Sequence, residues 1–222
     1  MAYPPRVQKP GQLFHAYAHG VDECTIFRDD EDFLSFLGLV ERECKLSGWA
    51  IVEYTLLHTH YHFLLELTQP TLSSGFQRLQ SMYARSFNKK YGRRGALWEK
   101  RYDAVLIEHE LHLFEVIRYI AWNAPKAGLC ARPEDYAWCS YGAAVGVRPA
   151  DRIADADRLL RHFGVDTTDA HRLLQALVDE KDPRGRPVSE TSRRRLGDSL
   201  RTAAPAELRE GVVDVAGEHA PA

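Results

Sequence analysis

The chain has 222 residues, 45% of them hydrophobic and 27% charged, and its formal net charge is −2 with neutral histidines. This composition is that of a globular protein, and the length allows one domain of about 150 residues with an appendage. No apolar run approaches the roughly 20 residues that cross a bilayer, and the N-terminus lacks the apolar core of a signal peptide. We therefore expect a cytoplasmic protein with no membrane partner. The four cysteines are widely spaced, which favours neither a disulfide framework nor a thiolate zinc site.

The first 125 residues alternate between strand and helix patterns. The predicted elements are, in order, a strand over about 12–19, a helix over about 30–46, strands over 49–57 and 60–67, a helix over about 71–90, a strand over 101–108 and a helix over about 110–123. This order is typical of the α+β ferredoxin-like fold, an antiparallel sheet with helices on one face. The opposite face of such a sheet is available for function.

The character of the chain changes after about residue 148. Two short helices are predicted over 155–163 and 168–180, followed by a basic, turn-rich linker and an Ala-, Glu- and Pro-rich end that we expect to be disordered. The helix pair fits either a DNA-binding helix-turn-helix or a small extension packed on the main domain, and its few arginines favour the extension. We therefore predict a catalytic domain over 1–148, a helical extension over 149–182 and a basic, then flexible, tail over 183–222.

Three histidines stand within five residues, in the segment His58-Thr59-His60-Tyr61-His62, between apolar flanks. Residues i and i+2 of a strand project from the same face, so His60 and His62 should lie side by side. Two neutral imidazoles on one strand face can hold one divalent cation. The alternative is that these histidines are structural or lie on the surface. This interpretation is less favoured, because three histidines occur within only five residues.

The third predicted helix carries a polar stripe beside its apolar one. The stripe has spacings of three, four and four residues and consists of His112, Glu115, Tyr119 and Asn123. Because Pro125 disfavours helical geometry at Ala124, the helix should end at about Asn123. A phenol and an amide would then stand one turn apart, where the phenol can attack a phosphate and the amide oxygen can complete a metal site. The alternative for Tyr119 is a tyrosine at the rim of the core.

The segment from Phe76 to Arg101 is strongly basic, with eight Lys and Arg residues and one acid, Glu99. Basic side chains bind phosphates, and the interleaved aromatic rings can stack on unpaired bases for about 1–3 kcal/mol each. A solvated helix face would explain buried rings but not the one-sided charge. The candidate DNA contacts are Arg78, Arg85, Lys89, Lys90, Arg93, Arg94, Lys100 and Arg101.

Five motifs together resemble one family. They are Ile26-Phe27-Arg28-Asp29-Asp30, His60-Tyr61-His62, the run from Arg118 to Asn123, Lys126-Ala127-Gly128-Leu129 and the run from Pro133 to Tyr141. The chain, over about residues 7–145, is similar to the REP-associated tyrosine transposases and their insertion-sequence relatives in the HUH endonuclease superfamily. The resemblance implies a ferredoxin-like palm, a homodimer and single-stranded DNA substrates carrying hairpins. By position it implies Tyr119 as the nucleophile and His60, His62 and Asn123 as ligands of Mg²⁺ or Mn²⁺.

The chain departs from the common family pattern at three places. Before the His-Tyr-His motif, where the family commonly has Pro-Asn, this chain has His58-Thr59. After the first strand it has His19-Gly20-Val21 in place of Arg-Gly-Asn, and at the end of the third helix it has Asn123-Ala124-Pro125 in place of Asn-Pro-Val. The early Arg and Asn are therefore absent, whereas the metal and tyrosine positions are kept.

The implied activity is DNA transposition by a metal-dependent endonuclease and strand transferase, which cuts single strands near hairpins through a 5′-phosphotyrosine. The main alternative is a non-catalytic protein that binds DNA or RNA hairpins, although binding alone needs neither the histidine pair nor Tyr119 and Asn123. A zinc hydrolase built on His58, His60 and His62 is less favoured. Three alternate strand positions span about 13 Å at roughly 3.3 Å per residue, too far for one ion.

Overall fold

The computed structural model describes residues 8–164 and 166–179. The strands are β1 (Leu13–His19), β2 (Trp49–Leu57), β3 (His60–Leu67) and β4 (Asp103–Leu106). The helices are α1 (Asp30–Ser47), α2 (Leu72–Lys90), α3 (Glu110–Ala121), α4 (Asn123–Lys126), α5 (Tyr141–Ala144), α6 (Ala156–Leu160) and α7 (Thr167–Asp179). Three short 3-10 turns occupy Val21–Glu23, Pro133–Asp135 and Arg161–Phe163.

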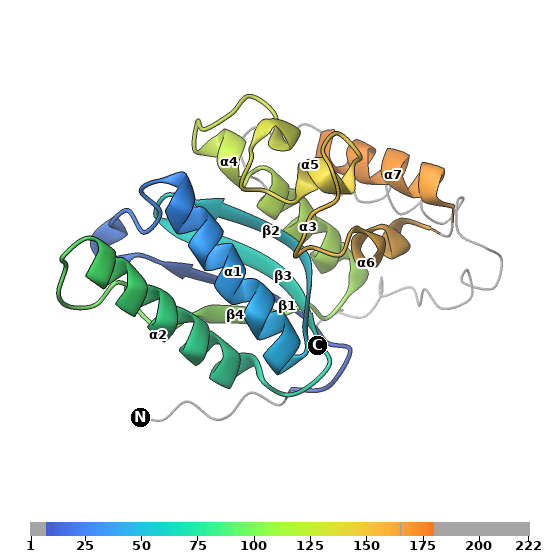
Figure 1. Ribbon diagram of the computed structural model, residues 1–222. Coiled ribbons are helices and arrows are strands. Elements are labelled where there is room, and N and C mark those ends of the chain that lie inside the picture. The colour runs from blue at the N-terminus through green and yellow to red at the C-terminus, as the bar shows by residue number, and fades with distance from the viewer. Residues whose placement is uncertain (1–7, 165, 180–222) are drawn as a thin grey trace, which may run out of the picture.

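The four strands form one antiparallel sheet in the order β2-β3-β1-β4. In Figure 1, α1 and α2 run side by side across the front of this sheet. Their apolar sides bury a large core against the sheet, in which Phe36 of α1 and Phe76 of α2 meet Tyr61 and Phe63 of β3. The α+β, ferredoxin-like antiparallel sheet is thereby confirmed, with α1 and α2 together on one face.

Local sequence signals explain where these elements start and stop. The Asp29 side chain accepts a hydrogen bond from the backbone N–H of Asp32 at 3.0 Å, which caps α1, and Gly48 ends the helix in the left-handed region at φ 64°. The strands β2 and β3 form the predicted hairpin, closed by the pair Leu57 and His60. Only two residues, His58 and Thr59, remain for the turn.

The opposite face of the sheet is partly covered on its β2 side. There α3 packs over Val52 and Leu64 in a second core, to which α5, α6 and α7 also contribute. The two helices predicted after residue 148 are present as α6 with the following 3-10 turn, and as α7. Leu159, Phe163 and Leu174 of these elements lie in the same core as α3, so the helix pair packs against the main fold.

Two predicted boundaries differ from the structure. The strand predicted over 101–108 is ordered as a strand only over Asp103–Leu106, where it pairs with β1. The helix predicted to end at about Asn123 ends at Ala121, but a new helical turn, α4, begins at Asn123 and contains Pro125. A proline is tolerated in the first turn of a helix, because the N–H that it lacks would have no intrahelical partner there.

The tail predicted over 183–222 lies outside the described residues. Within the part of the chain that the structure describes, no helix combines the length and the apolar character needed to cross a membrane.

Candidate active site

The open part of the second sheet face carries a cluster of rings from two neighbouring strands. On β1, the side chains of His15, Tyr17 and His19 alternate with buried Phe14, Ala16 and Ala18. In the antiparallel register, Tyr17 pairs with His62 and His19 with His60. We call the surface made by His15, Tyr17, His19, His60 and His62 the histidine face. The rings of His60 and His62 lie side by side on it, with centroids 5.2 Å apart.

Helix α3 places Tyr119 directly over the histidine face. The Tyr119 ring centroid is 5.2 Å from that of His62 and 5.7 Å from that of His15, and the tyrosine is 42% exposed. One turn later, the buried Asn123 shares a side-chain hydrogen bond with His60. The structure therefore brings His60, His62, Tyr119 and Asn123 together from β3, α3 and α4.

The buried polar atoms at this place suit a metal ion. His62 is 3% exposed, its Nδ1 lies 3.0 Å from Nε2 of His15, and its own Nε2 is buried with no hydrogen-bond partner. A buried polar atom without a partner is costly, and an imidazole nitrogen without a proton is a metal ligand. Two imidazoles and the amide oxygen of Asn123 thus fit a divalent cation.

Burial lowers the pKa of three histidines of this face, His15, His60 and His62, which favours their neutral form. It lowers the pKa of His62 well below its usual value of 6.5, and neighbouring His15, His60 and His19 lower it further. Burial and the nearby His19 also lower the pKa of His60. Burial, with a smaller effect of His112, lowers the pKa of His15 to about 4. The neutral ring is the form that can coordinate a metal ion.

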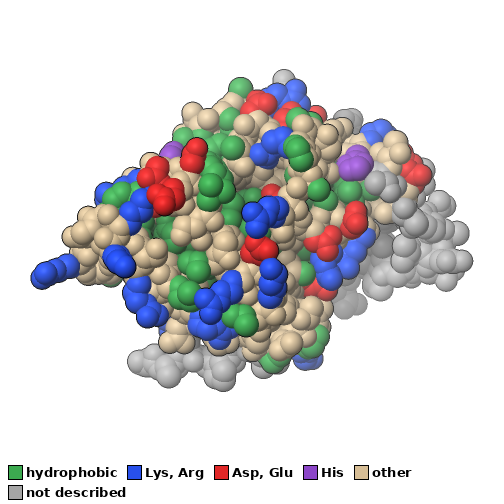
Figure 2. All heavy atoms as spheres, in the orientation of Figure 1, with side chains coloured by type: hydrophobic (Ala, Val, Ile, Leu, Met, Phe, Trp, Pro, Cys, Tyr) green, Lys and Arg blue, Asp and Glu red, His purple; other side chains and the backbone are tan. Residues whose placement is uncertain are grey.

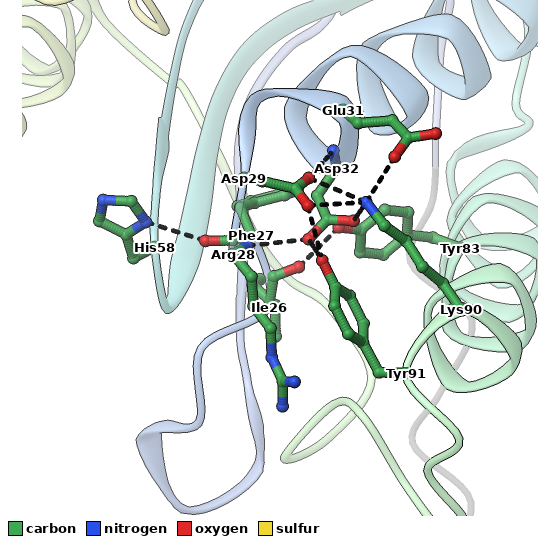
Figure 3. A network of polar contacts seen from close by, with 10 residues as sticks. All are labelled: Ile26, Phe27, Arg28, Asp29, Glu31, Asp32, His58, Tyr83, Lys90 and Tyr91. Carbon is green, nitrogen blue, oxygen red and sulfur yellow. Dashed lines mark hydrogen bonds and ion pairs between the residues drawn. The ribbon is translucent and has the colours of Figure 1, made fainter.

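His58 does not belong to this face. It lies in the two-residue turn, and its Nδ1 is 2.8 Å from the carbonyl oxygen of Phe27 (Figure 3). Its ring also contacts Phe33 of α1. The zinc hydrolase considered from the sequence needs His58 at a strand position alternate with those of His60 and His62. That placement is wrong, because β2 ends at Leu57 and His58 lies in the turn. Nor does any group of three His, Cys, Asp or Glu side chains among the described residues form a metal cluster, so a three-histidine zinc site has no support.

The predicted DNA contacts on α2 lie on the sheet face opposite to Tyr119. Figure 2 views the face covered by α1 and α2 and shows Lys and Arg side chains spread over α2. Two of these cations are held within the protein. The Arg78 guanidinium binds Glu43 at 2.9 Å, and the Lys90 ammonium lies 2.9 Å from each of Asp29, Glu31 and Asp32 (Figure 3). The remaining two on the helix, Arg85 and Lys89, are exposed.

The other four predicted contacts lie in the segment that leads from α2 to β4, residues 91–102. This segment reaches the histidine face, because the Glu99 N–H donates to the His19 carbonyl at 3.0 Å and Trp98 pairs with Gly20. We call residues 91–102 the basic loop. Arg94 and Arg101 are exposed on it, while Lys100 pairs with Asp103 at 2.8 Å and Arg93 bonds Asn88 at 3.1 Å.

Two side chains at the site were not predicted from the sequence. His15 contacts both His62 and Tyr119, and the alternation of His15, Tyr17 and His19 with small or aromatic buried residues is the signal that identifies it. Lys126 of α4 places its ammonium 5.6 Å from the centroid of the Tyr119 ring. Lys126 follows Asn123 by three residues and continues the polar stripe, but it lies beyond the end of the predicted helix at Asn123.

The chain is similar to known transposases in part of its sequence and in its fold. The family model described as "Transposase IS200 like" matches residues 24–123. A solved structure described as a REP-associated tyrosine transposase bound to a REP hairpin has a TM-score of 0.55 and 17% identity, over 70% of this chain and 93% of that one. A putative transposase from Deinococcus radiodurans R1 has a TM-score of 0.39 and 15% identity, over 50% and 91%. A search of curated proteins gives no match.

Proposed function

Since residues 24–123 belong to the IS200-like transposase family, we propose that this protein is a transposase that cuts and rejoins single-stranded DNA near hairpins. The observation that carries the proposal is the half-exposed Tyr119 over His62, beside Asn123 and His60. A phenol at this place can reach a phosphate bound over the histidine face. Binding of DNA alone would not require that arrangement.

In the proposed reaction, Tyr119 acts as the nucleophile. Its phenolic oxygen bonds to the phosphorus of the scissile phosphate, and the bond from phosphorus to the 3′-oxygen of the preceding nucleotide breaks. The phenol proton is transferred to that oxygen, which leaves as a free 3′-hydroxyl. The downstream strand stays attached through a 5′-phosphotyrosine, so the bond can be re-formed with another 3′-hydroxyl by the reverse step.

We propose that His60, His62 and Asn123 hold a Mg²⁺ or Mn²⁺ ion. The buried, unpartnered Nε2 of His62 and the neutral state of the rings support this assignment. A divalent cation bound there supplies Lewis-acid stabilisation of the charge on the scissile phosphate. The Lys126 ammonium adds positive charge near the Tyr119 ring.

We propose hairpin DNA as the substrate, because a protein of the same fold is described as bound to a REP hairpin. The basic loop lies beside the histidine face and is the segment best placed to contact the strand phosphates. A homodimer is also expected from the resemblance, and sedimentation of the full chain would test it.

The proposal is tested by covalent capture. Labelled single-stranded hairpin oligonucleotides are incubated with the full chain and Mn²⁺, and a DNA–protein adduct is sought on a denaturing gel. The adduct should vanish with Tyr119→Phe and with a chelator. Tyr83→Phe is the matched control and should keep the adduct, because Tyr83 of α2 is buried in the first core, on the far side of the sheet. Shifted but uncut DNA across a broad set of hairpins would contradict the transposase and favour a hairpin-binding protein.

A further inference from the structure

His15 is the residue of β1 that contacts the candidate metal ligand His62 most directly. Its Nε2 lies 3.0 Å from Nδ1 of His62, and their ring centroids are 5.2 Å apart. The rings of Tyr17 and His19 also come near His62, with centroids at 5.5 and 6.5 Å. Within the described part of the chain, neither Tyr17 nor His19 forms a side-chain hydrogen bond with His62.

In the hydrogen bond between the two histidines, one of the two facing nitrogens carries the proton and the other accepts it. If Nδ1 of His62 carries it and donates to Nε2 of His15, then Nε2 of His62 has a free lone pair. That nitrogen is the one that is buried without a hydrogen-bond partner. With the opposite proton placement, an N–H group of His62 would be buried with no acceptor, which costs free energy.

We propose that His15 is a positioning residue that fixes the tautomer and ring orientation of His62, so that Nε2 is presented to the metal ion. Metal-binding histidines generally donate their second ring N–H to a fixed acceptor, which orients the ring and raises its basicity. Carboxylates and backbone carbonyls are the common acceptors, and here a second imidazole takes that place. The inference rests on the proposed function, because it assigns a role at the same site.

The position of His15 in the sheet makes this contact rigid. It stands on β1 between two paired strands, opposite Leu64 of β3 and Val105 of β4. Its ring also contacts Tyr119, with centroids 5.7 Å apart. A change at His15 would therefore alter the ligand without breaking the strand, since alternate residues Phe14 and Ala16 carry the packing of β1 in the first core.

The first test reads the tautomer directly, in the metal-free full chain. The ¹⁵N chemical shifts of the histidine rings distinguish a protonated from an unprotonated nitrogen. We expect His62 protonated at Nδ1 in the wild type, and a mixture of tautomers in His15→Leu. A wild-type His62 protonated at Nε2 would overturn the proposal without any reference to activity.

The second test measures Mn²⁺ affinity by calorimetry for wild type, His15→Leu and His15→Gln. Leucine removes the acceptor, and the affinity should fall about 10- to 100-fold, whereas the glutamine oxygen can accept the Nδ1–H of His62 and should restore most of it. His58→Gln is the matched control, because His58 is hydrogen-bonded on the other side of the sheet. Its affinity should equal that of the wild type.

These measurements separate the two proposals. Wild-type Mn²⁺ binding that His15→Leu leaves unchanged would overturn the role of His15 and leave the proposed metal site intact. A wild type that binds no Mn²⁺ and forms no adduct would overturn the proposed function and the role of His15 with it. If His15→Leu fails to fold, two measurements still decide. A wild-type His62 protonated at Nε2, or a 10- to 100-fold loss of Mn²⁺ affinity in His15→Gln, contradicts the acceptor role of His15.

Discussion

Glu53 of β2 is a fully buried carboxyl group that the proposed reaction does not use. Both of its oxygens lack a hydrogen-bond partner, and it stands at a register shift of β2 that interrupts the pairing with β3 after Ile51. At such a bulge the strict alternation of side chains is lost, which explains how an acid comes to lie inside. Burial raises the pKa of Glu53 well above its usual range, which favours the protonated carboxyl group in the folded protein.

We predict that Glu53→Gln makes the folded protein more stable than the wild type at pH 7 but not near pH 4. Below the unfolded pKa of about 4.3, both states of the wild type carry the proton and nothing is lost. As the pH rises, the unfolded state ionises first. The free energy of unfolding then falls by about 1.4 kcal/mol per pH unit until the folded pKa is reached. Urea unfolding at pH 4, 5.5 and 7 measures the difference, and a constant gap between the two proteins would contradict it.

At the scale of elements, local patterns predict which side chains share a face but not which elements meet. Strand alternation places His60 beside His62, and helix phase places Tyr119 one turn before Asn123, as the structure has them. The alternation of His15, Tyr17 and His19 places His15 on one face of β1, but its contact with His62 also depends on β1 lying next to β3, which strand alternation alone does not show. The charge of 76–101 likewise does not reveal that α2 packs on the far side of the sheet while the basic loop reaches His19.

The separation of the basic residues leads to a prediction about DNA binding. Replacing Arg94 and Arg101 of the basic loop by alanine should weaken hairpin binding. It should also make the slope of log binding constant against log salt concentration shallower, by about 0.7–0.9 for each lost phosphate contact. Replacing Arg85 and Lys89 of α2 removes the same charge from the opposite side of the sheet and should leave the slope unchanged. Fluorescence anisotropy of a labelled hairpin at several salt concentrations distinguishes the pairs. A larger effect of the α2 pair would show that DNA binds over α2.

At the scale of the whole molecule, the C-terminal helices support the element that carries the nucleophile. Leu173, Leu174 and Leu177 of α7 are buried in the second core with Phe114 and Ile117 of α3. Trp122 stands between Tyr119 and Asn123 in the sequence, and its indole N–H donates to the Val178 carbonyl at 2.6 Å. The helical extension therefore holds the junction of α3 and α4 at the edge of the histidine face.

We predict that Leu174→Ala lowers both stability and the rate of adduct formation. Leu174 is completely buried, and such truncations cost about 2–5 kcal/mol, so the melting temperature should fall. Because the cavity lies behind α3, Tyr119 and Asn123 should lose part of their fixed geometry over His62. The adduct should then form more slowly even at temperatures where the variant is folded. Leu34→Ala is the matched control, since Leu34 is 60% exposed on α1 and its loss should change stability by no more than about 0.5 kcal/mol. A folded Leu174→Ala variant with an unchanged adduct rate would mean that the extension adds stability without positioning the nucleophile.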